Sequence, residues 1–124
     1  MLFRSFDTAT VHRISAPGLV ELIESGKADS EETEAFLRQI LAPYVGKLDA
    51  LVLGCTHYPF VKAPIARILG EQTLLFDGGA GTARQTQRLL EQEGLLNEGD
   101  GSLTMENSAG TPELLELSYQ LLEA

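Results

Sequence analysis

One stretch near the middle of the chain, LVLGCTHYPF at residues 51–60, decides which fold the sequence predicts. The apolar residues 50–53 are typical of a short buried strand, and Gly54 ends that run. Pro59 suits the first position of a helix, where the N–H that proline lacks would have no partner in any case. The stretch therefore predicts a strand, a tight turn and a helix, with Cys55 at the carboxyl end of the strand.

Outward from this stretch, the sequence alternates between strand-like and helix-like patterns. β-branched or apolar runs predict strands at residues 8–15, 50–53, 73–76 and 103–107. Apolar residues at helical spacing predict helices at about 16–24, 30–43, 59–69, 80–93 and 111–122. Asp29 or Ser30 can cap the second helix, Pro43 should end or kink it, and Gly26, Gly70 and Gly94 are placed to stop three others. Such alternation favours an α/β fold with a parallel sheet.

Composition narrows the classes of function. A chain of 124 residues is expected to form one domain, and its net charge of −9 disfavours nucleic-acid binding through a basic surface. No apolar run reaches 18 residues, so no membrane helix is expected. A single cysteine forms no internal disulfide, which suits a cytoplasmic location. Neither a cluster of metal ligands nor a pyridoxal-type lysine is evident, and we expect no cofactor.

Cys55 is the residue that points to chemistry. It lies at the carboxyl end of a predicted parallel strand, where ligands bind in open α/β sheets. The positive end of the following helix and the imidazole of His57 both favour thiolate over thiol. The alternative is an inert cysteine that packs as a small apolar residue.

The string Leu-Gly-Cys-Thr-His-Tyr-Pro at residues 53–59 resembles the second catalytic motif of the glutamate racemases. Residues 16–24 are similar to a Pro-x-x-Val-x-x-x-Glu helix of that family, which ends here at Glu24. Residues 76–79 resemble its Ile-Asp-Ser-Gly turn, with Gly78 in place of serine. Further similarity at 80–96 and 110–113 extends the resemblance from about Val11 onward. His57, where aspartate-type relatives usually carry glutamate, favours glutamate as substrate.

The resemblance implies a fold and a domain plan. The fold would be α/β, a parallel-sheet three-layer sandwich of the aspartate/glutamate racemase type, in incomplete form. Residues 1–75 would belong to the second racemase domain, and residues 76–124 would return towards the first. The family's Asp-Ser-Gly turn and Cys-Asn-Thr motif are absent from these 124 residues, so the chain corresponds to the later part of a racemase and is expected to be a fragment.

The resemblance also assigns roles to four residues. Cys55 would be one of two cysteines that serve opposite faces of the substrate, and Thr56 would bind the substrate. His57 would assist Cys55 and contact the substrate, while Glu24 would hold or tune His57. Other interpretations remain open: His57 could cap a helix, Glu24 could be an ordinary solvated carboxylate, and Glu21, one turn earlier, could replace Glu24.

The function implied is cofactor-independent interconversion of L- and D-glutamate, which supplies D-glutamate for peptidoglycan, the cell wall and cell shape. The expected partners are glutamate and a possible second copy of the chain, with no nucleic acid and no membrane. This chain alone, which lacks the opposing cysteine of the earlier half, is expected to be inactive. The alternative from another class is a non-catalytic binding half of a racemase-like fold. A thiol-dependent hydrolase or redox protein is a third interpretation, but neither a second cysteine nor a Ser-His-acid set supports it.

Overall fold

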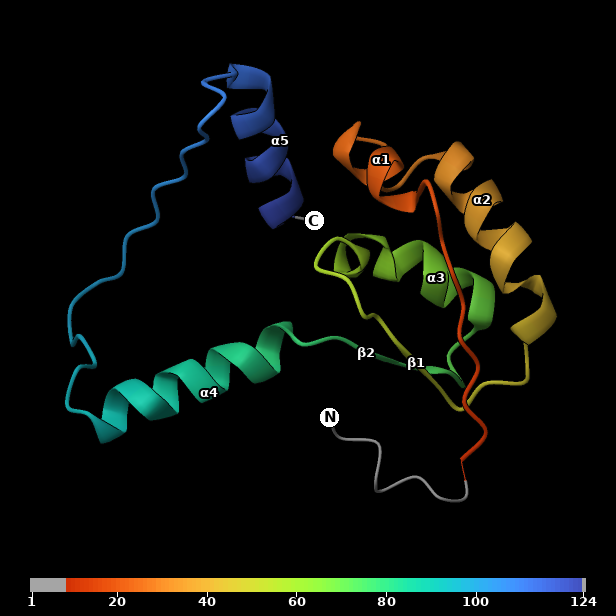
Figure 1. Ribbon diagram of the computed structural model, residues 1–124, viewed down its shortest axis with the longest axis horizontal. Helices are drawn as coiled ribbons and strands as arrows, with labels where there is room; N and C mark the ends of the chain where they lie inside the picture. The colour runs from red at the N-terminus through yellow and green to blue at the C-terminus, as the bar shows by residue number, and fades with distance from the viewer. Residues whose placement is uncertain (1–8, 124) are drawn as a thin grey trace.

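The computed structural model describes residues 9–123 as an α/β arrangement with a small parallel sheet (Figure 1). In chain order, the elements are α1 (Leu19–Glu24), α2 (Glu31–Leu41), the 3₁₀ turn η1 (Ala42–Tyr44), β1 (Ala50–Val52), the 3₁₀ turn η2 (Tyr58–Val61), α3 (Lys62–Leu69), β2 (Leu74–Phe76), α4 (Gly79–Gln92) and α5 (Pro112–Glu123). The predicted α/β class with parallel strands is therefore confirmed. None of the described helices is both long and apolar enough to span a membrane.

The sheet consists of β1 and β2, which run parallel with Leu51 opposite Leu75. The N–H of Leu53 donates to the carbonyl of Phe76 at 2.7 Å and extends the ladder beyond the strand ends. Side chains alternate between the two faces of a strand, so Leu51 and Leu75 lie against the core while Val52 and Phe76 point away from it. Val52 is 71% exposed and Phe76 51%, which leaves one face of the sheet uncovered by the described residues.

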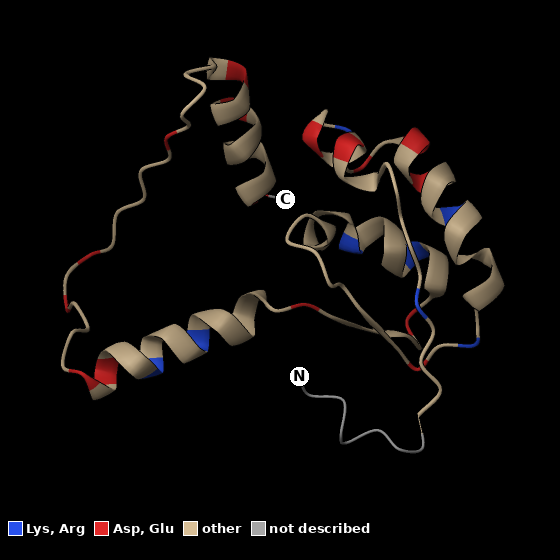
Figure 2. Cartoon of the chain, viewed as in Figure 1, with Lys and Arg blue, Asp and Glu red and all other residues tan. Residues whose placement is uncertain are grey.

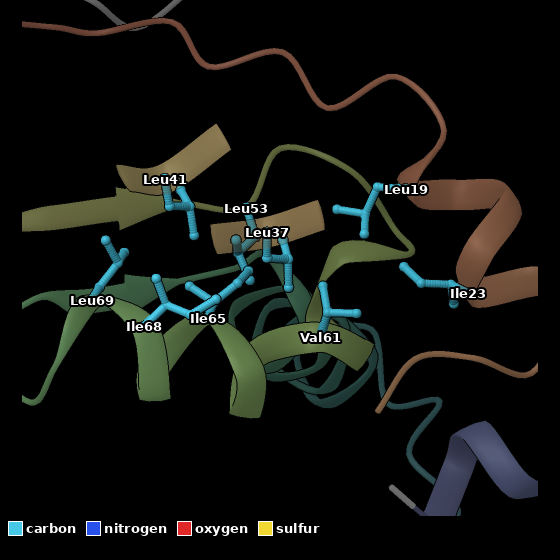
Figure 3. Close-up of a cluster of buried hydrophobic side chains, with 9 residues drawn as sticks. All are labelled: Leu19, Ile23, Leu37, Leu41, Leu53, Val61, Ile65, Ile68 and Leu69. Carbon is cyan, nitrogen blue, oxygen red and sulfur yellow. The ribbon is translucent and has the colours of Figure 1, made fainter. Parts of the chain in front are cut away.

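The core lies on the covered face of the sheet, where α1, α2 and α3 pack together (Figure 3). Its nine buried apolar residues are Leu19, Ile23, Leu37, Leu41, Leu53, Val61, Ile65, Ile68 and Leu69. Buried Thr33 is satisfied, because its hydroxyl donates to the carbonyl of Lys27 at 2.7 Å. This core anchors the two elements that hold the predicted site, the C-terminal end of α1 and the loop after β1.

Local signals set the helix ends largely as expected. Of the two candidate caps for α2, Ser30 takes the position, and its hydroxyl accepts the N–H of Thr33 at 3.2 Å. The α-helix ends at Leu41, and Pro43 lies in the following 3₁₀ turn. Gly70 follows α3 with φ 83°, a left-handed conformation that favours glycine.

The helix after Cys55 begins later than predicted. Pro59 lies in the 3₁₀ turn η2, and the α-helix starts only at Lys62. The reason is Pro64. If the α-helix began at Pro59, Pro64 would lie in its interior and remove a hydrogen bond to the carbonyl of Phe60. A start at Lys62 places Pro64 in the first turn, where no N–H is needed.

Two predicted strands do not form. Within the described part of the first one, residues 9–15 are irregular, and Thr8 lies outside the described residues. Residues 103–107 are irregular as well, with Leu103 63% exposed. Both predictions rested on β-branched or apolar composition, which is a weak preference unless a neighbouring strand pairs with the segment. Among the described residues, β1 and β2 pair only with each other.

The C-terminal third lies largely outside this core. The helix α4 leads away from β2, and an irregular segment, residues 93–111, then returns the chain to the side of α1 (Figure 1). There α5 makes contact through two leucines. Leu121 packs against the core, and Leu117 lies 3.8 Å from the position that a Cβ on Gly26 would occupy. The exposed helix α4 therefore lies in sequence between two elements that contact the core, β2 before it and α5 after it.

Candidate functional site

Cys55 lies just beyond the end of β1, in the irregular loop that leads into η2. Its neighbour Leu53 is buried in the core and fixes the start of this loop. The thiol is partly buried, and its Sγ lies 3.9 Å from Nδ1 of His57. The structure thus holds the predicted thiol and imidazole in direct contact at the carboxyl end of the sheet.

The surroundings of Cys55 favour its thiolate. The backbone N–H of His57 and then the His57 side chain lower the pKa of the Cys55 thiol below its ordinary value, although burial acts in the opposite direction. The N–H of Tyr58, at the start of η2, adds to the same effect. These are the free donors expected at the beginning of a helical segment. The helix dipole argument therefore applies through η2, although the α-helix begins later.

Glu24 supplies the carboxylate that contacts His57. It is the last residue of α1, and its Oε1 lies 3.0 Å from Nε2 of His57, a contact between residues 33 apart in sequence. Cys55 first, and Glu24 to a smaller extent, raise the pKa of His57 above its ordinary value, against burial. The geometry therefore selects Glu24 over Glu21 as the acidic neighbour of His57.

A cleft of about 880 Å³ opens beside the thiol. Cys55 and Thr56 line one wall and the first three turns of α4 line the other, with Thr82, Thr86 and Gln87 among the wall residues. Neither His57 nor Glu24 is among the described residues that line the cleft. The pair therefore lies behind Cys55, and its contacts with the residues of the cleft are those of His57 with the thiol and with Thr56, whose Oγ1 is 3.4 Å from Nδ1 of His57.

Asp77 is a cleft residue that the sequence interpretation passed over as part of a tight turn. Its Oδ1 accepts the N–H of Gly79 at 2.7 Å and so caps the start of α4, while its other oxygen pairs with Lys62 at the start of α3. Lys62, followed by Gly79, lowers the pKa of the Asp77 carboxyl below its ordinary value. Its position directly after β2 could have identified Asp77 as a candidate site residue. The carboxyl ends of parallel strands lie at the same edge of a sheet, so Asp77 could be expected near Cys55.

The described residues hold no cluster of three or more histidine, cysteine or acidic side chains that could bind a metal ion. The polar groups that line the cleft are instead the Cys55 thiol, three threonine hydroxyls, the Gln87 amide and the Asp77 carboxylate, with an imidazole behind the thiol. Such a set can accept and donate protons and hold a small polar ligand.

Fold and site together define a class, an α/β protein that places an acidic thiol at the carboxyl end of a parallel strand beside an open cleft. No protein-family model matches the chain. Individual relatives do: a glutamate racemase of Clostridium perfringens is 44% identical over 113 residues, which are 89% of this chain and 44% of the relative. One from Clostridium kluyveri is 38% identical over 98% of this chain and 49% of the relative. The chain is thus similar in sequence to one part of the glutamate racemases, and it spans about half the length of these relatives.

Solved structures give the same assignment. A glutamate racemase of Thermus thermophilus, solved in complex with β-chloro-D-alanine, superposes with a TM-score of 0.71 and 34% identity, over 85% of this chain and 42% of that one. A glutamate racemase isoform of Bacillus anthracis gives a TM-score of 0.63 at 29% identity, over 74% of this chain and 35% of that one. The α/β arrangement described above is thus the fold of part of a glutamate racemase.

Proposed function

We propose that this chain provides one acid/base half of a cofactor-independent glutamate racemase, with Cys55 as the group that exchanges a proton with Cα of the substrate. The observation that supports it is the row Cys55–His57–Glu24, which ends in a thiol at the cleft of a chain related to glutamate racemases. The thiol's lowered pKa adds to this support, because a proton acceptor works best when its pKa is near the working pH.

In the proposed reaction, the Cys55 thiolate takes the proton from one face of Cα and becomes a thiol. The C–H electron pair stays on the substrate as a carbanion, and a second acid returns a proton to the opposite face. His57, protonated and held by Glu24, stabilises the thiolate before the transfer. Thr56, which lines the cleft beside the thiol, would hold a polar group of the substrate, while the N–H groups of His57 and Tyr58 stabilise the thiolate.

We propose that the second acid is a cysteine from outside this chain, because the resemblance implies two cysteines and Cys55 is the only one in the 124 residues. We propose that residues 1–75 belong to the second racemase domain and that residues 76–124 return towards the first. The exposure of α4 supports this plan. The boundary after residue 75 falls inside β2. The proposed setting is the cytoplasm, where D-glutamate would enter peptidoglycan synthesis and so support the cell wall and cell shape. A relative from Francisella tularensis was solved in complex with D-glutamate, in keeping with glutamate as the substrate.

The test uses a chimera in which this chain replaces the matched 113-residue segment of the Clostridium perfringens racemase. We expect the chimera to interconvert L- and D-glutamate, measured by circular dichroism from either enantiomer. Cys55→Ala in the chimera should reduce turnover by about 10²–10⁴-fold or more in both directions, because it removes one acid/base group. Glu21→Gln serves as the control and should leave turnover unchanged.

A folded chimera that binds glutamate without racemising it would favour the alternative, a non-catalytic binding half. Full turnover after Cys55→Ala would remove Cys55 from the proposal. The isolated chain, kept dilute so that single copies predominate, should not racemise glutamate, since one acid/base group serves one face of Cα.

A further inference from the structure

Cys55, His57 and Glu24 form a row of nucleophile, base and acid. Sγ of Cys55 lies 3.9 Å from Nδ1 of His57, and Nε2 of the same ring lies 3.0 Å from Oε1 of Glu24. Enzymes that transfer acyl groups activate their nucleophile in this way, with a base that contacts the nucleophile and a third group that orients the base. The sequence offered no such set in support of a thiol-dependent hydrolase, and the structure assembles one across 33 residues.

Cys55 also lies where such a nucleophile is accessible. It is in the loop between β1 and η2, and together with Thr56 it lines the open cleft of about 880 Å³. Where a nucleophile sits between a strand and a helix, the N–H of the next residue can stabilise the oxyanion of the tetrahedral intermediate. Here that next residue is Thr56. The cleft therefore offers room for an acyl compound beside the thiol.

The position of His57 limits the leaving group. His57 is not among the described residues that line the cleft, so its ring does not directly protonate a group that departs into the cleft. An amine needs such a proton in order to leave, whereas an aryl oxide or a thiolate leaves as a stable anion. The site therefore favours aryl esters and thioesters over amides.

The charge of the chain bears on the acyl group. The net charge is −9, and Figure 2 shows acidic positions on α1, α2 and α5. A small neutral acyl group avoids repulsion by a field of this sign. The acetyl group is the simplest example.

We propose that this chain by itself hydrolyses small neutral aryl esters and thioesters through an acyl-Cys55 intermediate, which His57 and Thr56 deacylate. The activity needs one thiol only. It is therefore independent of the proposed racemisation, which needs a second acid from elsewhere.

In the first step, the Cys55 thiolate bonds to the carbonyl carbon, and the bond to the leaving group breaks with its electron pair going to the aryl oxide or thiolate. Cys55 is the main cause of the raised pKa of His57, so acylation of the thiolate lowers that pKa again and the ring releases its proton to solvent. The enzyme then holds a thioester at Cys55 beside a neutral imidazole.

In the second step, a water in the cleft attacks the thioester. Its proton passes to the neutral ring through the hydroxyl of Thr56, which lines the cleft and has its Oγ1 3.4 Å from Nδ1 of His57. The oxygen of the water bonds to the acyl carbon, and the carbon–sulfur bond breaks. The products are the carboxylic acid and the original pair of thiolate and imidazolium.

The experiment is the hydrolysis of p-nitrophenyl acetate by the full chain, followed through the absorbance of p-nitrophenolate. We expect a stoichiometric burst, an acetylated chain in the mass spectrum, and then steady turnover. Cys55→Ala should remove all three. Thr56→Val replaces the hydroxyl by a methyl group and should slow steady turnover about 10²-fold more than it slows the burst, because it removes the route to the general base.

Glu24 acts through His57 and is a positioning residue, so its test is a pH profile. Glu24→Gln should move the pH midpoint of the burst rate upward, since less imidazolium then stabilises the thiolate. Glu21→Gln, one turn earlier on α1, is the matched control and should leave the midpoint in place. Equal midpoints in the two variants would overturn the proposed row.

The choice of acyl compound tests the substrate class. Phenyl thioacetate should be hydrolysed, and p-nitroacetanilide, the amide with the same acyl group, should not. Comparable rates for the amide and the ester would overturn the assignment. So would a burst without turnover, turnover that survives Cys55→Ala, or a Thr56→Val variant that slows the burst and the turnover equally.

Racemisation is measured separately on the chimera described above. Ester hydrolysis by this chain together with a chimera that does not racemise glutamate leaves this inference standing and counts against the proposed function. A racemising chimera together with a chain that does not turn over the ester has the opposite meaning.

Discussion

At the residue scale, the character of Cys55 depends on a short chain of donors and acceptors rather than on the cysteine itself. His57 lies between the thiol and the carboxylate of Glu24, at 3.9 Å from Sγ and 3.0 Å from Oε1. A protonated imidazole donates from both ring nitrogens, so a single ring can stabilise the thiolate on one side while the carboxylate stabilises the ring on the other. The thiol's acidity is therefore coupled to α1, an element far from it in sequence.

We expect the alkylation rate of Cys55 by iodoacetamide to rise with pH around a midpoint below about 8.5, the ordinary value for a cysteine. Glu24→Gln should move this midpoint upward, because the raised pKa of His57 falls when its carboxylate partner is lost and less imidazolium remains. Glu21→Gln is the matched control, one turn earlier on the same helix, and should leave the midpoint in place. Equal effects of the two substitutions would contradict the proposed row of contacts.

Asp77 provides a second prediction at this scale. Lys62 and the N–H of Gly79 hold its pKa below the ordinary value, so its ionised form is favoured more in the folded than in the unfolded chain. The resulting stability is present above the unfolded pKa near 3.9 and is lost as pH falls through the lower folded value. Asp77→Asn should therefore lower the free energy of unfolding at neutral pH and reduce its loss on acidification.

Urea unfolding at a series of pH values measures the Asp77 effect. Glu98→Gln, in the irregular segment after α4, is the control and should preserve the pH dependence of the original chain. If the free energy of unfolding fell as steeply on acidification in Asp77→Asn as in the original chain, the prediction would be wrong.

At the scale of the element, each helix is limited by one or two residues whose effect is local. Ser30 begins α2 by accepting the N–H of Thr33, Pro64 delays the start of α3, and Gly70 ends α3 in a left-handed conformation. The cap at Ser30 and the stop at Gly70 involve neighbours in sequence and could be predicted without a fold, whereas the delay caused by Pro64 was not predicted.

Ser30→Ala should reduce the free energy of unfolding by about 1 kcal/mol, with a range of about 0.5–2, because the N–H of Thr33 loses its acceptor. Chemical denaturation with a single-transition fit measures this change. The control is Ser102→Ala, in the irregular segment 93–111, which should change stability by no more than about 0.5 kcal/mol. A loss at Ser30 no larger than at Ser102 would mean that the cap does not stabilise α2.

At the scale of the whole molecule, burial is one-sided. The nine core residues lie between one face of the sheet and the helices α1 to α3, while Val52 and Phe76 on the other face and all of α4 are exposed. Stability is thus concentrated in residues 14–76, and the C-terminal elements depend on the contacts of α5 and on what covers α4.

Leu37 tests this distribution, because it is 1% exposed and lies at the centre of the core. Leu37→Ala should cost about 2–5 kcal/mol of unfolding free energy through lost burial and the cavity left behind. The same substitution at Leu103, 63% exposed, should cost far less. Similar costs at the two positions, measured by thermal or urea unfolding, would show that the core does not lie where the structure puts it.

The sequence was a good guide wherever the deciding interactions are local. It predicted the two strands at residues 50–53 and 73–76, the helices around them and the position of Cys55 at a strand end, because periodicity, caps and glycine stops act within a few residues. It was wrong about strands at 9–15 and 103–107, because a strand needs a neighbour and composition does not supply one. It also passed over Asp77, whose importance comes from the distant Lys62.

By itself, then, the sequence determined the places of the five helices and of the two paired strands, the α/β class and the thiol–imidazole pair, since Cys55 and His57 are only two residues apart. Only the tertiary structure decided that Glu24, rather than Glu21, reaches His57 across 33 residues, and that α4 faces Cys55 across a cleft. The physical reason is that these contacts join elements whose relative placement depends on the packing of the shared core. No local pattern encodes that placement, because it is the sum of many contacts between residues far apart in the chain.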